Sequence, residues 1–167
     1  MTNDELKQTI KDMVIRGKGI LAADESVKTA TKRLTSINVE STEETRRQYR
    51  NVMLTAPGME NYIVGVIFFE ETLHQKSNDG ILFPEVLAKK GIVPGIKVDQ
   101  GLEDFDDSGQ QYTQGLDGLG DRLEEYKKSG TRFTKWRAVY SISENTPTDE
   151  LIQKNAQDLA KYAKICQ

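Results

Sequence analysis

The stretch YIVGVIFFEE, from Tyr62 to Glu71, begins with a nearly continuous apolar run and ends in two carboxylates. Such a run is typical of a strand that is buried on both faces, as strands of parallel sheets are. Three other stretches also open with a short apolar run and are expected to form strands: GILAADES from Gly19, IVPGIKVDQG from Ile92 and FTKWRAVYSI from Phe133.

Helical patterns lie before, between and after these strands. Thr2 and Glu5 have the spacing of a capping box, and Ser41 and Glu44 repeat that spacing before a second helix. A short amphipathic segment ends at Gly91, where glycine can terminate a helix. The expected helices cover residues 2–17, 41–54, 83–91, 119–130 and 146–167.

The last expected helix has the clearest signals. Thr146 is the predicted cap, Pro147 suits the first helical position, and Asp149 completes a capping box. It carries one apolar stripe, formed by Ile152, Ala156, Leu159, Ala160 and Ala163.

The alternation of strands and helices predicts an α/β fold with a parallel sheet covered by helices. Two architectures are compatible with this order, an open doubly wound sheet and part of a (β/α)8 barrel. The chain contains no linker, low-complexity tract or fixed repeat, so residues 1–167 are expected to form one domain without a second one.

Composition excludes several classes of protein. The net charge is −3 and the isoelectric point is about 5.3, so no strongly basic surface favours nucleic acid. No apolar run approaches the roughly 18 residues of a membrane span, and the polar N-terminus predicts no secretory signal. One cysteine, Cys166, and one histidine, His74, argue against disulfides and zinc, which favours a cytoplasmic location and chemistry based on lysines and carboxylates.

Polar side chains occur in pairs near the C-terminal ends of three expected strands. Because strand side chains alternate with period two, members of each pair are expected to share a face. The pairs are Asp24 with Ser26, Lys97 with Asp99, and Lys135 with Arg137. One interpretation is that these charges simply turn into solvent.

The other interpretation is a binding site at the carboxyl end of the sheet, where α/β proteins bind ligands. A buried unpaired cation costs several kcal/mol, so Lys97, Lys135 and Arg137 would need the carboxylates of Asp24 and Asp99 nearby. One positive charge would remain, which favours an anionic ligand such as phosphate. A lysine among cations also suits amine chemistry.

Several longer motifs closely resemble class I fructose-bisphosphate aldolases, in the same order and over essentially the whole chain. They are GKGILAADES from Gly17, KRL from Lys32, ETLHQK from Glu71, GIKVDQG from Gly95, TQGLDGL from Thr113 and KWR from Lys135. The resemblance implies a (β/α)8 TIM barrel that reversibly cleaves fructose 1,6-bisphosphate to dihydroxyacetone phosphate and glyceraldehyde 3-phosphate. It also implies a Schiff-base lysine, no metal, no cofactor and a place in cytoplasmic glycolysis and gluconeogenesis.

The same resemblance implies roles for single residues. Asp24 and Lys135 would be catalytic, the first in proton handling and the second in helping the Schiff base to form. The substrate-binding residues would be Ser26, Thr29, Arg33, Lys97, Asp99 and Arg137. Arg33 matches a family arginine near one of the two phosphates.

A complete barrel needs roughly 250 residues, so a chain of 167 is expected to cover about the first four β/α units, the N-terminal half of an aldolase. The Schiff-base lysine and a glutamate pair would lie beyond it, and the chain alone is predicted to be inactive. Expected partners are a sugar bisphosphate, the rest of the barrel and, at full length, further copies in a homo-oligomer, with no nucleic acid or membrane. The alternative is a non-catalytic phosphate-binding or interaction module derived from an aldolase half-barrel.

Overall fold

The computed structural model describes residues 3–167, which form two compact units. We call the first the sheet unit; it contains the described residues up to Lys97 together with Tyr126–Thr134. We call the second the hairpin unit; it contains Val98–Glu125 and Lys135–Gln167.

The sheet unit is built on a four-stranded sheet with the order β1-β2-β3-β6. The strands are β1 (Gly19–Ala23), β2 (Ile63–Phe68), β3 (Val93–Lys97) and β6 (Phe133–Lys135), whose last residue already belongs to the hairpin unit. Neighbouring strands β1, β2 and β3 run parallel, and Ala23, Phe68 and Ile96 lie in register across them. All four predicted strands are therefore present, in a parallel arrangement, although each is shorter than expected.

Burial explains the apolar sequences of β2 and β3. In β3, the consecutive residues 93–96 are buried, so both faces of that strand are covered. In β2, the buried side chains of Val64, Val66 and Phe68 share one face, and those of Ile63 and Ile67 on the other face are half-buried. The ring of Phe133 lies directly against β3, and a Cβ atom at Gly95 would come within 2.4 Å of it. Glycine at this position therefore lets the aromatic ring of β6 pack against the backbone of the neighbouring strand.

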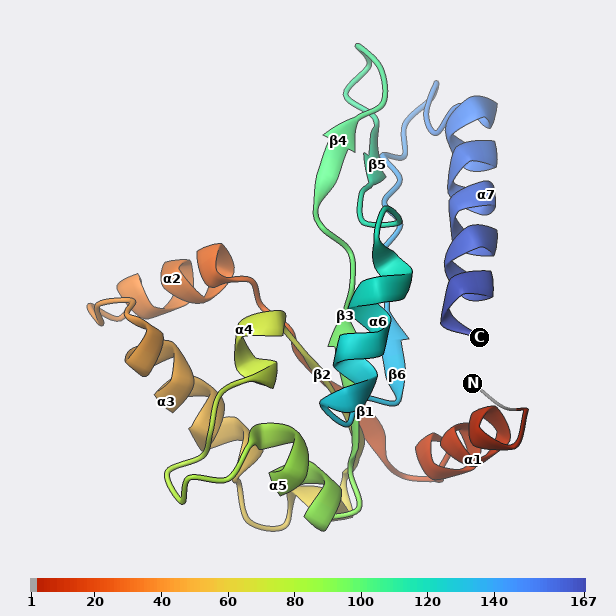
Figure 1. Ribbon diagram of the computed structural model, residues 1–167. Helices are drawn as coiled ribbons and strands as arrows, with labels where there is room; N and C mark the ends of the chain where they lie inside the picture. Colours follow the sequence, from red (N-terminus) through yellow and green to blue (C-terminus); the bar gives the residue numbers. More distant parts are fainter. Residues whose placement is uncertain (1–2) are drawn as a thin grey trace. The chain divides into compact units, whose positions relative to one another are not determined.

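The sheet unit also contains five α-helices and one 3-10 turn among its described residues. They are α1 (Asn3–Met13), α2 (Val27–Thr35), α3 (Glu43–Leu54), the 3-10 turn η1 (Met59–Asn61), α4 (Glu70–Leu73) and α5 (Phe83–Lys89). Figure 1 shows α2 and α3 packed side by side, in agreement with their contacts. The sequence interpretation missed α2 and α4, because α2 contains β-branched residues with weak helix propensity and α4 is only one turn long.

The predicted N-terminal cap of α3 is wrong. The capping box of α3 is formed by Thr42 and Thr45, not by Ser41 and Glu44. The Ser41 hydroxyl instead lies 2.7 Å from the Thr31 hydroxyl of α2, so it is not available as a cap. The other predicted box includes Thr2, which lies outside the described residues.

The hairpin unit contains an antiparallel pair that the sequence interpretation missed. Strands β4 (Leu102–Asp104) and β5 (Gln111–Thr113) pair with Leu102 opposite Thr113. Their sequences are polar, so they show none of the apolar runs that marked the other strands. The unit also holds the beginning of α6 (Leu119–Lys128) and α7 (Asp149–Cys166), which lies along β5 (Figure 1).

The predicted start of α7 is wrong, and its apolar stripe is not the face that the structure buries. Thr148, not Thr146, is the cap, because its hydroxyl accepts the backbone N–H of Leu151 while its own N–H is held by the Gln110 side chain at 2.8 Å. The buried face consists of Leu151, Asn155 and Asp158. Two members of the predicted stripe are largely exposed, Ile152 at 43% and Leu159 at 39%.

Strand β6 ends earlier than predicted, and this affects the predicted pair of Lys135 and Arg137. Strand β6 stops at Lys135, and the residues that follow it, 136–142, have no regular structure. Arg137 therefore lies outside the strand, and the alternation rule does not place it on the same face as Lys135. The carbonyl of Arg137 accepts a hydrogen bond from the hydroxyl of Thr113, at the end of β5.

No helix among residues 3–167 is both long enough and apolar enough to cross a membrane.

Candidate active site

The predicted site residues divide between the two units. The sheet unit contains Asp24, Ser26, Thr29, Arg33 and Lys97. The hairpin unit contains Asp99, Lys135 and Arg137.

Asp24 and Lys97 lie at the same edge of the sheet. Asp24 directly follows β1, and Lys97 is the last residue of β3. Because Ala23, Phe68 and Ile96 are in register, both residues are at the carboxyl edge, two strand spacings of about 4.8 Å apart along the hydrogen-bonding direction. The Lys97 ammonium lies 5.9 Å from the centre of the Phe69 ring, which follows β2 at this edge.

The turn between β1 and α2 brings two hydroxyl groups together. Ser26 caps α2, and its hydroxyl accepts the backbone N–H of Thr29 at 3.3 Å. The two side-chain oxygens lie 3.2 Å apart. The first turn of α2 contains no acidic residue, so the positive end of the helix dipole is not neutralised there. Hydroxyl donors at such a helix end can serve an anionic group.

Glu25, between Asp24 and Ser26, is the centre of a cluster that the sequence interpretation missed. One carboxylate oxygen pairs with the guanidinium of Arg33 and the other with that of Arg50. Tyr49 donates its hydroxyl to Glu25 at 3.3 Å and accepts from Arg33 at 2.9 Å. The RRQYR segment could have indicated this cluster, because helical spacing places Arg46, Tyr49 and Arg50 on one face of α3.

These contacts change the protonation behaviour of the cluster. Burial by itself would raise the pKa of Glu25, but the hydrogen bond from Arg50 and the charges of Arg50 and Arg33 outweigh burial and lower that pKa. The hydrogen bond with Tyr49 and the charge of Glu25 raise the pKa of Arg33. The Glu25 carboxylate and the Arg33 guanidinium therefore each favour the charged form.

In the hairpin unit, Asp99 and Lys135 are held close together by the backbone. The N–H of Val98 donates to the carbonyl of Lys135 at 3.1 Å, and Asp99, which is buried, follows it. The guanidinium of Arg122 donates to the carbonyls of Val98, at 3.1 Å, and of Gly115. Arg122 thus fixes the segment that carries Asp99, a role that the sequence interpretation missed although the TQGLDGL motif lies nearby.

Glycine is required at position 115 in the same unit. Its φ is +123°, and a Cβ atom would lie 2.9 Å from the carbonyl oxygen of Val98 and 3.0 Å from the amide nitrogen of Gln100. The close approach of the two backbone segments leaves no room for a side chain. It also holds the backbone on both sides of Asp99.

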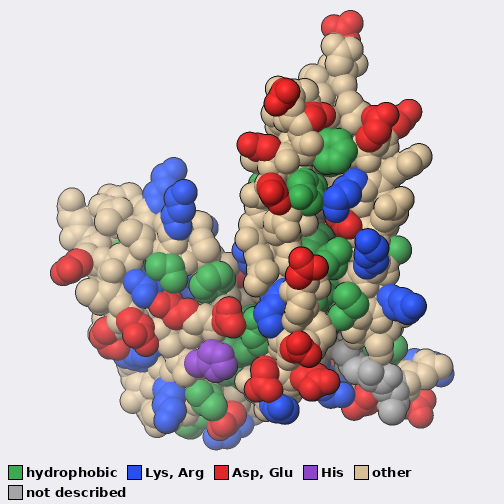
Figure 2. Space-filling model, turned by 45° about the horizontal axis from the view of Figure 1, so that its top comes forward, with side chains coloured by type: hydrophobic (Ala, Val, Ile, Leu, Met, Phe, Trp, Pro, Cys, Tyr) green, Lys and Arg blue, Asp and Glu red, His purple; other side chains and the backbone are tan. Residues whose placement is uncertain are grey.

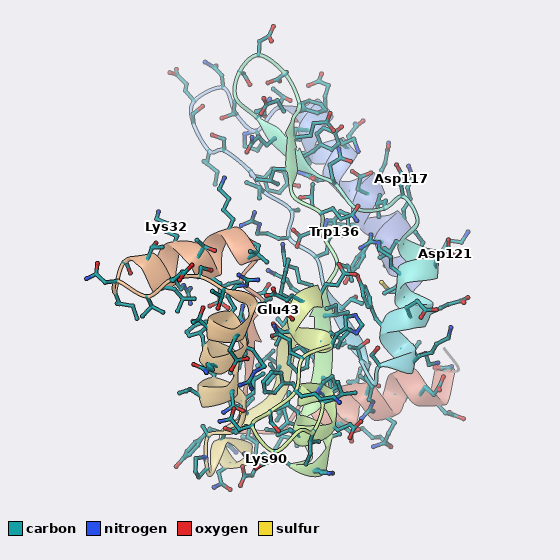
Figure 3. The ribbon with its side chains drawn as sticks, turned by 60° about the vertical axis from the view of Figure 1, so that its left-hand side comes forward. Lys32, Glu43, Lys90, Asp117, Asp121 and Trp136 are labelled. Carbon is teal, nitrogen blue, oxygen red and sulfur yellow. The ribbon has the colours of Figure 1, made fainter. Side chains whose placement is uncertain are left out.

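Arg137 is exposed, as Thr29 and Arg33 are. Within the described residues, no side chain pairs with its guanidinium, and only its carbonyl is engaged, by Thr113. The adjacent Trp136, labelled in Figure 3, packs against Tyr162 of α7 with ring centres 5.3 Å apart. This aromatic pair anchors the segment while Arg137 faces solvent.

The single histidine does not take part in either group. His74 ends the short helix α4 and is exposed, as Figure 2 shows for the only histidine side chain. Among residues 3–167, no three His, Cys, Asp or Glu side chains are arranged to hold a metal ion.

Comparison with known proteins assigns the chain to a family. The family model for glycolytic class-I fructose-bisphosphate aldolases matches residues 5–167. The chain belongs to the class I fructose-bisphosphate aldolase family. The resemblance predicted from the motifs is therefore confirmed.

Individual aldolases match over nearly the whole chain. A probable class 1 fructose-bisphosphate aldolase of Xanthomonas campestris is 48% identical over 100% of this chain and 50% of its own length. Cytosolic fructose-bisphosphate aldolase 5 of Arabidopsis thaliana is 52% identical over 98% of this chain and 46% of its own. The chain thus spans about half the length of the curated aldolases that it matches.

A solved aldolase supports the fold prediction. Fructose-bisphosphate aldolase of Plasmodium falciparum, crystallised with TRAP and a small-molecule inhibitor, is 46% identical and superposes with a TM-score of 0.93. The match covers 98% of this chain and 48% of the aldolase. The predicted α/β fold of the (β/α)8 barrel family, with this chain covering about the first four β/α units, is confirmed.

Proposed function

We propose that this chain supplies the N-terminal part of the active site of a class I fructose-bisphosphate aldolase. The complete enzyme would reversibly cleave fructose 1,6-bisphosphate into dihydroxyacetone phosphate and glyceraldehyde 3-phosphate. The observation that carries the proposal is the aldolase family match over residues 5–167, which includes every predicted site residue. The single barrel domain of the whole protein is part of the same proposal.

The proposed reaction depends on a lysine from the part of aldolase that this chain does not span. Its amine attacks the substrate ketone and loses water to form a Schiff base. The protonated imine then accepts the electron pair of the breaking carbon–carbon bond, while a base removes the proton of the substrate hydroxyl. The residues of this chain would bind the substrate, orient it and stabilise charge around that lysine.

Two residues are assigned catalytic roles in this proposal. Asp24, at the carboxyl end of β1, would orient a substrate hydroxyl and handle its proton. Lys135, at the end of β6, would favour the Schiff base electrostatically, because a neighbouring cation keeps part of a lysine population unprotonated and nucleophilic.

The remaining residues are assigned to substrate binding. Ser26 and Thr29 offer hydroxyl groups at the start of α2, and Lys97 and Arg137 offer positive charge. Arg33 would bind one phosphate group, and Asp99 would accept hydrogen bonds from substrate hydroxyls or from neighbouring lysines. Charge-assisted hydrogen bonds of this kind recognise phosphate oxygens well.

We also propose a cytoplasmic location and a homo-oligomeric complete enzyme, without nucleic acid or membrane as partners. Support for the location comes from relatives named as cytosolic, such as the Arabidopsis aldolase. The other half of the barrel is the proposed structural partner of this chain.

Borohydride trapping tests the proposed chemistry directly. The chain is combined with the C-terminal half of a related aldolase, incubated with dihydroxyacetone phosphate, reduced with borohydride and weighed by intact mass spectrometry. We expect one adduct, in which the reduced imine has replaced the ketone oxygen, on the C-terminal half. If no adduct forms although the halves associate, or if it forms on the chain described here, the proposed division of the site is wrong.

A further inference from the structure

Glu25 binds two arginines in very different environments. One carboxylate oxygen pairs with Arg33 and the other with Arg50, so a single negative charge is shared by two positive charges. All three residues belong to the sheet unit. The question is why a carboxylate beside Asp24 and Ser26 should need both partners.

Arg50 is a permanent partner of Glu25. Its side chain is only 3% exposed, and its guanidinium also donates to the backbone carbonyl of Glu25 at 2.8 Å. It lies over the ring of Tyr49, 5.2 Å from the ring centre. A buried charge that lost its partner would be strongly destabilising, so this pair is expected to remain intact in every state of the protein.

Arg33 is a replaceable partner of the same carboxylate. Its side chain is 57% exposed, and its contacts are made by Nη1 alone, to Glu25 and to the Tyr49 hydroxyl. Within the described residues, its other two nitrogens have no protein partner. An exposed ion pair of this kind contributes little stability, so another anion can take its place.

We propose that Glu25 is an internal substitute for a phosphate group: it holds the guanidinium of Arg33 in the unliganded protein and releases it to the phosphate of a bound sugar phosphate. This inference rests on the proposed function, in which Arg33 binds phosphate. Arg50 keeps the released carboxylate in place and neutralised, so Glu25 does not repel the incoming ligand strongly.

The exchange has a simple physical advantage. A phosphate dianion carries more charge than a carboxylate and can accept hydrogen bonds from two guanidinium nitrogens at once. It can therefore displace Glu25, while competition from Glu25 weakens binding enough to let the phosphorylated product leave. Arg33 is also held in place beforehand, which reduces the ordering that binding requires.

The test follows the Arg33 Nε–Hε signal by NMR during titration of this chain with inorganic phosphate. Arg33→Gln assigns the signal and should weaken phosphate binding roughly tenfold or more, as expected for loss of a charge-assisted hydrogen bond. The matched control is Lys32→Gln, which removes a neighbouring exposed cation of α2 (Figure 3) and should leave the Arg33 titration nearly unchanged.

The decisive variant is Glu25→Gln combined with Arg50→Gln. It removes the competing carboxylate without leaving a buried arginine unpaired, and the net charge of the cluster does not change. Phosphate should then bind about two- to fivefold more tightly, which corresponds to loss of one exposed ion pair. Glu44→Gln, which disrupts the exposed pair with Arg47, is the control for a general charge effect and should not reproduce the full gain.

The outcomes separate the two proposals. Two results together support the exchange. The double variant should bind phosphate more tightly than the wild type, and the Arg50 signal of the wild type should not change when phosphate is added. If phosphate shifts Arg33 but the folded double variant binds no more tightly, the exchange is wrong while the phosphate role of Arg33 stands. If phosphate does not shift Arg33 in any folded variant, both are wrong.

Discussion

Asp24 and Lys97 show how far single residues can be predicted. Each follows an apolar run, and the structure places both at the carboxyl edge of the sheet. Glu25 shows the limit, because its partner Arg50 comes from a helix 25 positions later. No local spacing reveals such a contact, since it depends on how α3 packs in three dimensions.

Asp24→Asn should lower turnover of the complete enzyme far more than it raises KM. The amide keeps the size and hydrogen-bonding capacity of the side chain but cannot take a proton. Steady-state kinetics with fructose 1,6-bisphosphate measure both parameters, and Lys32→Gln serves as the control. An unchanged turnover would remove Asp24 from the catalytic group.

Arg137→Ala should weaken substrate use through the phosphate group. A charge-assisted hydrogen bond contributes roughly 1.5–3 kcal/mol, so kcat/KM should fall by about one to two orders of magnitude. Because the side chain is exposed and its guanidinium makes no side-chain contact within the described residues, stability should change little. Measuring kcat/KM with fructose 1-phosphate and with fructose 1,6-bisphosphate will show whether the loss depends on the second phosphate. If Arg137→Ala also lowered the unfolding free energy by about 1.5–3 kcal/mol, the residue would have a structural role instead.

At the scale of helices and strands, the order of the main elements was predictable and their ends were not. Apolar runs located all four strands of the parallel sheet, but they could not show that β6 ends at Lys135. The polar strands β4 and β5 carry no such signal. For α7, the apolar pattern favoured Ile152 and Leu159, whereas the structure buries polar Asn155 and Asp158 on the face that packs inward.

Gly95→Ala should destabilise the sheet unit by about 1–3 kcal/mol, because the added methyl group overlaps the Phe133 ring. Phe133→Leu should partly relieve this cost, so the two changes should be non-additive in urea unfolding. Gly120→Ala in α6 is a matched control, since its new Cβ would meet no atom within 4 Å. If Gly95→Ala were as stable as that control, the packing described for β3 and β6 would be incorrect.

The lowered pKa of Glu25 predicts acid sensitivity of the turn between β1 and α2. A carboxyl group with a depressed folded-state pKa stabilises the fold above its unfolded value, near 4.5, and this contribution is lost as the pH falls toward the folded value. The unfolding free energy should therefore decrease as the pH falls below about 4.5. In the Glu25→Gln, Arg50→Gln double variant, the unfolding free energy should decrease less steeply with falling pH than in the wild type and in Lys32→Gln. An equal slope in all three proteins would show that Glu25 does not cause the acid sensitivity.

For the whole molecule, the motifs identified the family correctly, whereas the arrangement of the eight site residues across two units was not visible in the sequence. The chain alone is expected to show no aldolase activity, because a nucleophile, its acid–base partner and the phosphate ligands act as a unit. A coupled assay on the purified chain, with and without a complementary C-terminal half, measures this. Activity of the chain alone, above a control purified from cells that lack it, would overturn the proposed division.

The isolated chain is also expected to associate with itself, since β1 and β6 each have a neighbour on only one side. Sedimentation over a range of concentrations measures this, and adding the complementary half should suppress it. A monomer at every concentration that unfolds cooperatively would contradict the expectation.

The strand order β1-β2-β3 also bears on how the protein is made. During synthesis, each of these strands leaves the ribosome after the one beside which it will lie, so every new strand meets an edge that already exists. Pairing can therefore advance in step with translation from β1 to β3. About 35 residues separate β3 from β6, a gap similar to the roughly 39 residues between β1 and β2. The segment before β6 differs in containing the β4–β5 hairpin, whose strands pair with each other while the edge of β3 is still unpaired.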